Sequence, residues 1–135
     1  MSDLAPIITV STDLPRGLVK FAASGLWGEE QVKEGSAKIG LAAAPFVRAR
    51  KPFSILADYS EAIVAPREAT ELIRDSFVAA RKMGLQRIAV FNAPVLVQMQ
   101  YKRLADVVAI AFFDSKIDAL AWLREAQADA DPEHA

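Results

Sequence analysis

Polar side chains that could do chemistry gather where a predicted strand gives way to a helix, in the stretch LADYSEAIVAPREATELI (residues 56–73). Its turn, Asp58-Tyr59-Ser60-Glu61, could hold a catalytic acid or a phosphorylated serine. Asp and Ser at a strand end more often satisfy the backbone amides of a turn. The sequence therefore favours a structural turn and leaves the catalytic acid and the phosphorylation switch as alternatives.

Composition excludes much of catalytic chemistry. The 135 residues include no cysteine, so a disulfide, a thiolate nucleophile and an iron–sulfur cluster are all absent. The one histidine, His134, lies one residue from the end of an acidic tail. Ser-His-Asp hydrolysis and histidine-dominated metal sites are therefore disfavoured. We expect a protein that is not an enzyme and that uses no cofactor and no metal.

Charge and hydropathy restrict the partners. The 16 cations and 17 acids nearly cancel, so no global field draws the chain to nucleic acid or to an anionic membrane. No apolar run reaches the roughly 18 residues of a membrane span, and the start MSDLAPIITV has no signal-peptide pattern. We expect a soluble, cytoplasmic protein with one domain over residues 1–127 and a frayed acidic tail over 128–135.

The hydrophobic periodicity predicts alternating strands and helices. Two β-rich runs, 7–11 and 18–23, surround a turn with Asp, Pro and Gly, which indicates a hairpin. Short apolar runs typical of buried strands follow at 52–59, 87–92 and 107–113. Helical patterns lie between and after them, at 28–44, 66–82, 93–105 and 114–128. The fold class is therefore α/β, with a largely parallel, mixed five-stranded sheet, an N-terminal hairpin and four helices.

Local signals mark the helix ends. Pro45 should stop the first helix near Ala44. Gly84 stands in the usual position after a helix C-terminus. Asn92 is a candidate cap for the third helix, and a serine at 115 with an acid three residues later has capping-box spacing.

This layout resembles the STAS, or SpoIIAA-like, domains, and within them the small stand-alone bacterial proteins described as STAS/SEC14-like. The likeness spans Ile7 to about Ala126 and includes the initial hairpin, the strand end ASGLWGEEQVKEGSAKI and the pair FSILADYSEAIVAPREATELI. In those proteins the second strand commonly ends in a glycine, and acidic residues start the first helix. Gly25, Glu29 and Glu30 match this pattern. The resemblance implies a SpoIIAA-like fold and a binding or regulatory role.

The phosphorylation motif of the family is missing. Antagonists of anti-sigma factors in this group carry Asp-Ser-Ser/Thr-Gly at the start of the helix, where a serine is phosphorylated. Here those positions read Pro66-Arg67-Glu68-Ala69, and neither Ser60 nor Thr70 occupies the matching place. The resemblance therefore implies a module without the serine switch.

Ligands of open parallel sheets bind at the carboxyl ends of the strands. The polar residues expected there, as candidates for binding an anion or another ligand, are Tyr59, Ser60, Arg67, Asn92 and Asp114. Pro66 suits the first turn of its helix, and Ala65 before it is a poor cap, so backbone donors stay free for water or an anion. For Arg67 an anion clamp and a solvated side chain beside Glu68 both remain open.

The helical segment APVLVQMQY has apolar groups around most of its circumference, more than one buried face requires. Either both sides are covered, or a patch faces a partner or ligand. The candidates for an apolar surface or pocket are Trp27, Val95, Met99 and Tyr101. We therefore expect a module that acts through a protein partner or a homodimer. The alternative is a carrier or sensor of a small apolar or lipid-like molecule, as the SEC14 likeness implies.

Overall fold

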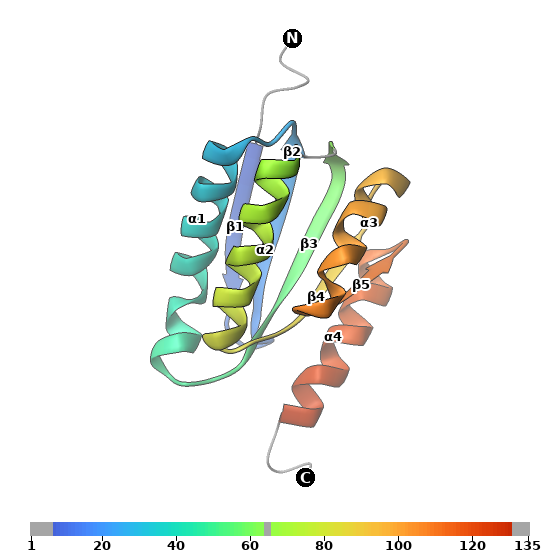
Figure 1. The fold of residues 1–135 in the computed structure, drawn as a ribbon. Helices are drawn as coiled ribbons and strands as arrows, with labels where there is room; N and C mark the ends of the chain where they lie inside the picture. The colour runs from blue at the N-terminus through green and yellow to red at the C-terminus, as the bar shows by residue number, and fades with distance from the viewer. Residues whose placement is uncertain (1–6, 64–65, 131–135) are drawn as a thin grey trace.

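One mixed sheet of five strands forms the centre of the protein in the computed structural model, which describes residues 7–63 and 66–130 (Figure 1). The elements are β1 (Ile7–Asp13), β2 (Leu18–Gly25), α1 (Glu29–Arg48), β3 (Phe53–Ala62), α2 (Arg67–Lys82), β4 (Leu85–Phe91), α3 (Val95–Lys102), the 3-10 turn η2 (Arg103–Asp106), β5 (Ala109–Phe113) and α4 (Lys116–Ala130). The strands are ordered β1-β2-β3-β4-β5, with β1 antiparallel to β2 and the others parallel. The fold class, the hairpin and the order of elements expected from the sequence are confirmed.

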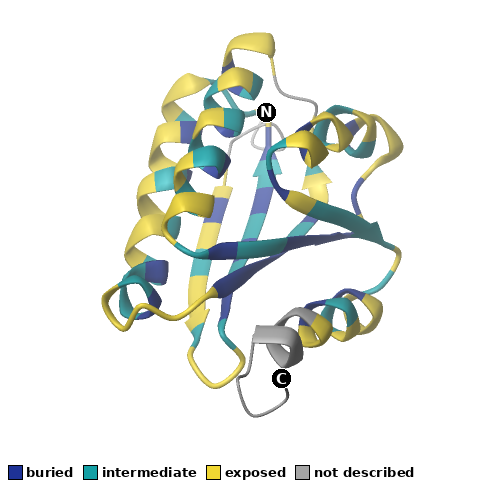
Figure 2. Cartoon of the chain, turned by 60° about the horizontal axis from the view of Figure 1, so that its bottom comes forward, coloured by how far each residue is buried: buried dark blue, intermediate teal, exposed yellow. Residues whose placement is uncertain are grey.

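Helices cover both faces of the sheet. On one face, side chains of α1, α2 and α3 such as Val32, Ile73 and Val97 share a core with alternate residues of the strands. On the other face, α4 packs its Leu123 on a smaller cluster that includes Leu56 of β3. Figure 1 shows α1 and α2 side by side over the first strands. Figure 2 shows that burial is concentrated in the central strands and that the outer faces of the helices are exposed.

Helix α1 continues through Pro45 and ends at Arg48, so the predicted end near Ala44 is wrong. A proline in a helix removes one hydrogen-bond donor but leaves its own carbonyl able to accept. Here the Ala49 amide donates to the Pro45 carbonyl at 3.2 Å. The buried ring of Phe46 also stacks on Phe53, with 5.9 Å between ring centroids. The packing of Phe46 in the last turn of α1 therefore outweighs the one backbone hydrogen bond that Pro45 cannot donate.

Strand β3 extends to Ala62, so the predicted turn at residues 58–61 is also wrong. The register with β2 shifts here, because Ala22 is opposite Asp58 whereas Ser24 is opposite Glu61. Such a shift is a β-bulge. Asp58 Oδ1 accepts hydrogen bonds from the Ser60 amide at 3.0 Å and from the Ser60 hydroxyl at 2.8 Å. The residues that indicated a turn form a bulge instead, and they satisfy local donors as expected.

The other end signals had different outcomes. Gly84 follows α2 with φ of 117°, and the Asp118 amide donates to Ser115 Oγ at 3.2 Å, so both predictions are confirmed. The cap of α3 is Pro94 rather than Asn92, and Pro66 is the cap of α2 rather than a first-turn residue.

Strand β5 is an edge strand and only partly buried, because it has a neighbour on one side only. Helix α4 includes residues 128–130 of the expected tail, and the rest of that tail lies outside the described residues.

Two glycines of α1 provide a matched test of this packing. A Cβ at Gly40 would meet no atom within 4 Å, so Gly40→Ala should raise the free energy of unfolding by about 0.5–1 kcal/mol through helix propensity. A Cβ at Gly35 would lie 2.9 Å from the Trp27 ring, so Gly35→Ala should lose that gain. Urea unfolding of both variants measures the difference. Equal stabilisation would contradict the contact between Gly35 and Trp27.

Candidate functional site

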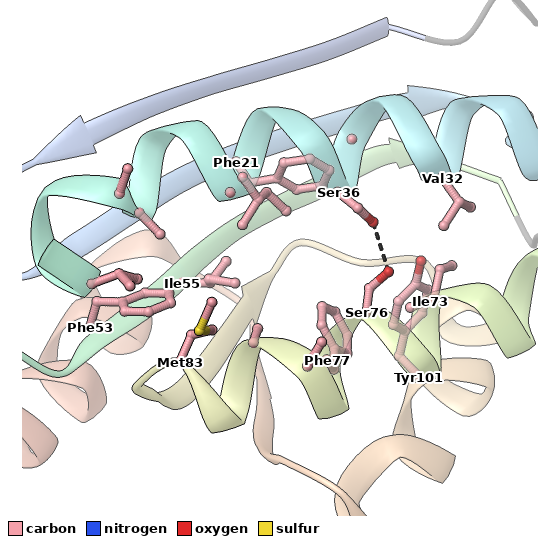
Figure 3. Close-up of a pocket in the computed structure, with 18 of the residues that line it drawn as sticks. Phe21, Val32, Ser36, Phe53, Ile55, Ile73, Ser76, Phe77, Met83 and Tyr101 are labelled. Carbon is pink, nitrogen blue, oxygen red and sulfur yellow. Dashed lines mark hydrogen bonds between the residues drawn. The ribbon is translucent and has the colours of Figure 1, made fainter. Parts of the chain in front are cut away.

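A pocket of about 520 Å³ lies between α1, α2 and the face of the sheet that they cover (Figure 3). This volume is within the range of about 300–1,000 Å³ that is typical of small-molecule sites. Phe21 and Ile55 of the sheet form its floor, and Ile73 and Phe77 of α2 form one wall. Most of the lining side chains are apolar, so the pocket is suited to an apolar guest.

Small residues on the facing sides of α1 and α2 leave this space open. They are Gly35, Gly40, Ala43, Ala44, Ala79 and Ala80, and all of them line the pocket. Larger side chains at these positions would fill the gap, as side chains do in most protein interiors. Gly40 also weakens α1 relative to alanine, since glycine is a poor helix former. The pocket therefore exists because the side chains on the facing sides of α1 and α2 are too small to fill the space between the helices.

One hydrogen bond joins the two helices across the pocket. The hydroxyls of Ser36 on α1 and Ser76 on α2 are 2.7 Å apart (Figure 3). Ser76 Oγ also donates to the Leu72 carbonyl at 2.9 Å. Because a serine hydroxyl has one proton, Ser36 is the donor in the pair. Lone pairs of Ser36 then remain able to accept a hydrogen bond from a ligand.

Two tyrosines form the polar part of one end. The rings of Tyr59 on β3 and Tyr101 on α3 are 5.0 Å apart, and Tyr59 also meets Phe21 edge-on at 6.2 Å. Burial raises the pKa of the Tyr59 hydroxyl well above its usual value, and the adjacent Tyr101 raises it further. Burial also raises the pKa of Tyr101 to about 12. Both phenols are therefore neutral near pH 7 and can serve as hydrogen-bonding groups.

Trp27 closes the same end of the pocket. Its ring meets Phe21 edge-on at 5.7 Å and lies against Gly35, where a Cβ would clash. The indole nitrogen donates to the Ser24 carbonyl at 3.2 Å, which fixes the ring in the connection between β2 and α1. Trp27 was one of the residues predicted for an apolar surface or pocket, and the structure places it in the pocket wall.

The residues predicted at the strand ends are separated in the structure. Tyr59 is buried within β3 and lines the pocket, whereas Ser60 beside it is exposed. Arg67 at the start of α2 is almost fully exposed and its Nε lies 3.6 Å from a carboxylate oxygen of Glu71. The exposed Asn92 and Asp114 follow β4 and β5, whose ends are linked by a bond from the Asn92 amide to the Phe113 carbonyl. Tyr59 therefore lines the pocket, and the other four residues lie outside it at separate exposed positions.

The apolar residues of α3 face in different directions. Val97 is 1% exposed and packs in the core, and Tyr101 lines the pocket. Val95, Leu96 and Met99 are 71%, 66% and 59% exposed. The apolar side chains around α3 thus comprise one core residue, one pocket residue and an exposed patch. Of the four predicted apolar candidates, Trp27 and Tyr101 are in the pocket, and Val95 and Met99 are on the surface.

Several lining residues were not among the predicted site residues, for example Ser36, Arg48 and Ser76. The repeated glycine and alanine of α1, together with Ala79 and Ala80 of α2, are the one sequence signal that could have indicated a gap between helices. Across residues 7–63 and 66–130, no three His, Cys, Asp or Glu side chains gather closely enough to hold a metal ion. Within the same ranges, no helix combines the length and apolar character needed to cross a bilayer.

The layered sheet with its hairpin and four helices has a SpoIIAA-like fold. A crystal structure of an uncharacterised protein of the DUF3478 family from Shewanella loihica PV-4, described as having a SpoIIAA-like fold, is similar to it with a TM-score of 0.63. The two chains are 18% identical over 88% of this chain and 94% of that one. The resemblance expected from the sequence is therefore confirmed for the fold. No protein-family profile and no curated protein matches the chain.

Proposed function

We propose that this domain is a non-enzymatic binding module that holds a small apolar molecule in the pocket between α1 and α2. The observation that carries the proposal is the preformed apolar pocket of about 520 Å³. Each CH₂ group transferred from water into such a site contributes roughly 0.8 kcal/mol. The proposal corresponds to the carrier or sensor that was the alternative expectation from the sequence.

The polar groups of the wall favour binding over bond-making chemistry. The Ser36–Ser76 pair and the two tyrosines offer hydroxyls. A phenol is already protonated at neutral pH with its usual pKa near 10, and burial raises the pKa of both tyrosines further. A protonated phenol is a poor base and a poor nucleophile. These groups can instead orient a ligand through one or two hydrogen bonds, which is the usual role of the few polar groups in an apolar site.

Two measurements test the proposal. Native mass spectrometry of the purified protein should detect a bound apolar molecule, or the emptied protein should take up the neutral dye N-phenylnaphthylamine with increased fluorescence. Ala44→Phe, which fills the pocket from α1, should weaken dye binding at least tenfold, or about 1.4 kcal/mol. Ala37→Phe places the same group on the exposed side of α1, away from the lining residues, and should change nothing.

Two results would contradict the proposal. One is a protein that contains no ligand and does not bind the dye. The other is equal dye affinity of the Ala44→Phe and Ala37→Phe variants, because a site elsewhere would then be responsible.

The outward patch of α3 supports a second candidate function, which is contact with a protein partner or with a second copy of the chain. Val95, Leu96 and Met99 are large apolar side chains that remain mostly exposed on one short helix. Exposed apolar groups that lie together are common at protein interfaces. Analytical ultracentrifugation at increasing protein concentration tests self-association, and the variant that isolates this patch is discussed below.

A further inference from the structure

We infer that the pocket takes a single-chain amphiphile with an anionic head group, whose tail lies along α1 and α2 and whose head lies where both helices end. This inference rests on the proposed function and specifies its ligand. It is carried by the shape of the pocket and by the distribution of charge around its two ends.

The pocket is elongated along α1. Its lining on that helix extends from Val32 to Arg48, which at 1.5 Å per residue is a length of about 24 Å. The pocket has a volume of about 520 Å³ and is lined mostly by apolar side chains. An extended hydrocarbon chain fits a site of this length and character.

One end of the pocket is basic. In the described part of the chain, Arg48 is the single charged residue that lines the pocket, and it is the last residue of α1. Arg50 and Lys51 follow it in the connection to β3, and Lys82 ends α2. The Phe53 amide donates to the Gly84 carbonyl at 3.1 Å, so these two connections lie against each other. Four cations therefore lie on the two helix ends and connections that meet at this end.

These cations have no acidic residue close to them along the chain. The sequence contains no Asp or Glu from residue 35 to 57 or from residue 76 to 105. Among the described residues, none of the four cations lies in an ion pair. In a chain whose net charge is −1, this end is thus a local concentration of unpaired positive charge. Such a region attracts anions even when the whole protein does not.

Helix dipoles explain only part of this pattern. Cations near a helix C-terminus compensate a partial charge of about −0.5 per helix, so the ends of α1 and α2 together account for about one of the four. Arg50 and Lys51 also lie beyond the last turn of α1. At the opposite end, Glu29 and Glu30 begin α1 and Glu68 lies in the first turn of α2. Arg67 also begins α2 there, so that end has no comparable excess of positive charge, and the charge distribution favours an anionic head at the basic end.

The test compares ligands that share one tail and differ in their head. Dodecanoate and dodecyl phosphate carry an anionic head, and dodecanol is neutral. Below their micelle concentrations and in low salt, both anions should displace N-phenylnaphthylamine at roughly tenfold lower concentration than dodecanol. High salt should reduce this preference, because exposed charges are screened. A preference for the phosphate over the carboxylate, or the reverse, identifies the type of head.

Charge reversal at the basic end locates the head. Arg48→Glu and Lys51→Glu should each reduce the preference for the anions. Lys51 does not line the pocket, so Lys51→Glu should also leave affinity for dodecanol and for the dye unchanged. Lys116→Glu makes the same change in charge on α4, across the sheet, and should alter neither. Equal displacement by dodecanol and dodecanoate, or an undiminished preference in both Arg48→Glu and Lys51→Glu, overturns the inference and leaves the apolar pocket as the binding site. Failure of the dye and all three ligands to bind overturns the proposed function as well.

Discussion

Phe77→Ala lowers the free energy of unfolding by about 3–5 kcal/mol, a large part of the stability of an ordinary domain. Phe77 is 8% exposed and lies on α2, in the same core as Ile55 of β3 and Ile88 of β4. Its removal costs the transfer free energy of the ring and leaves a cavity that cannot close, because the strands beneath it are fixed by their neighbours. Urea unfolding followed by circular dichroism measures the change.

Leu41→Ala is the control for this truncation. Leu41 is an apolar residue of α1 that is 79% exposed, so its loss should change the free energy of unfolding by no more than about 0.5 kcal/mol. A loss below about 1 kcal/mol for Phe77→Ala would show that α2 presents a different face to the sheet.

Val97→Glu and Met99→Glu should have opposite outcomes although they are two residues apart on α3. Val97 is 1% exposed, so a glutamate there would be an unpaired carboxylate in the core, at a cost of several kcal/mol. Met99 is 59% exposed, so a glutamate there should change stability by less than about 0.5 kcal/mol. Thermal unfolding of the two variants gives the comparison directly.

The Met99→Glu variant also tests the outward patch of α3. If the patch mediates self-association or binds a partner, this stable variant should lose that contact and retain dye binding in the pocket. A stable variant with unchanged oligomeric state would remove the patch as a candidate interface. A strongly destabilised one would mean that Met99 is buried, contrary to the structure.

The order of elements could be predicted because each has a short-range signal. Strands such as β4 are continuous apolar runs, and α2 alternates buried Ile73 and Phe77 with exposed charges at helical spacing. Helix ends could be predicted where a side chain or a glycine conformation determines them, as at Ser115 and Gly84. The end of α1 could not, because the packing of Phe46 on Phe53 is a contact with a later strand.

The candidate site was only partly predictable for a related reason. Tyr59 was expected at a turn, but the bulge in β3 continues the strand and directs this side chain into the pocket. The pocket itself depends on how closely two helices approach, and that distance results from small residues on both, such as Gly40 and Ala80. A pattern along one helix does not determine its distance from the next helix, because that distance depends on the facing residues of both. The basic end requires the same proximity, because its cations come from two separate connections.

The aromatic end of the pocket provides a built-in optical reporter. The chain has two tyrosines and two tryptophans. Both tyrosines and Trp27 line this end, whereas Trp122 lies on α4 against Phe113. Energy absorbed by Tyr59 or Tyr101 can therefore pass to a tryptophan that borders the same cavity. A molecule that enters the pocket changes the surroundings of all three rings together, so the intrinsic emission of the unlabelled protein reports its occupancy.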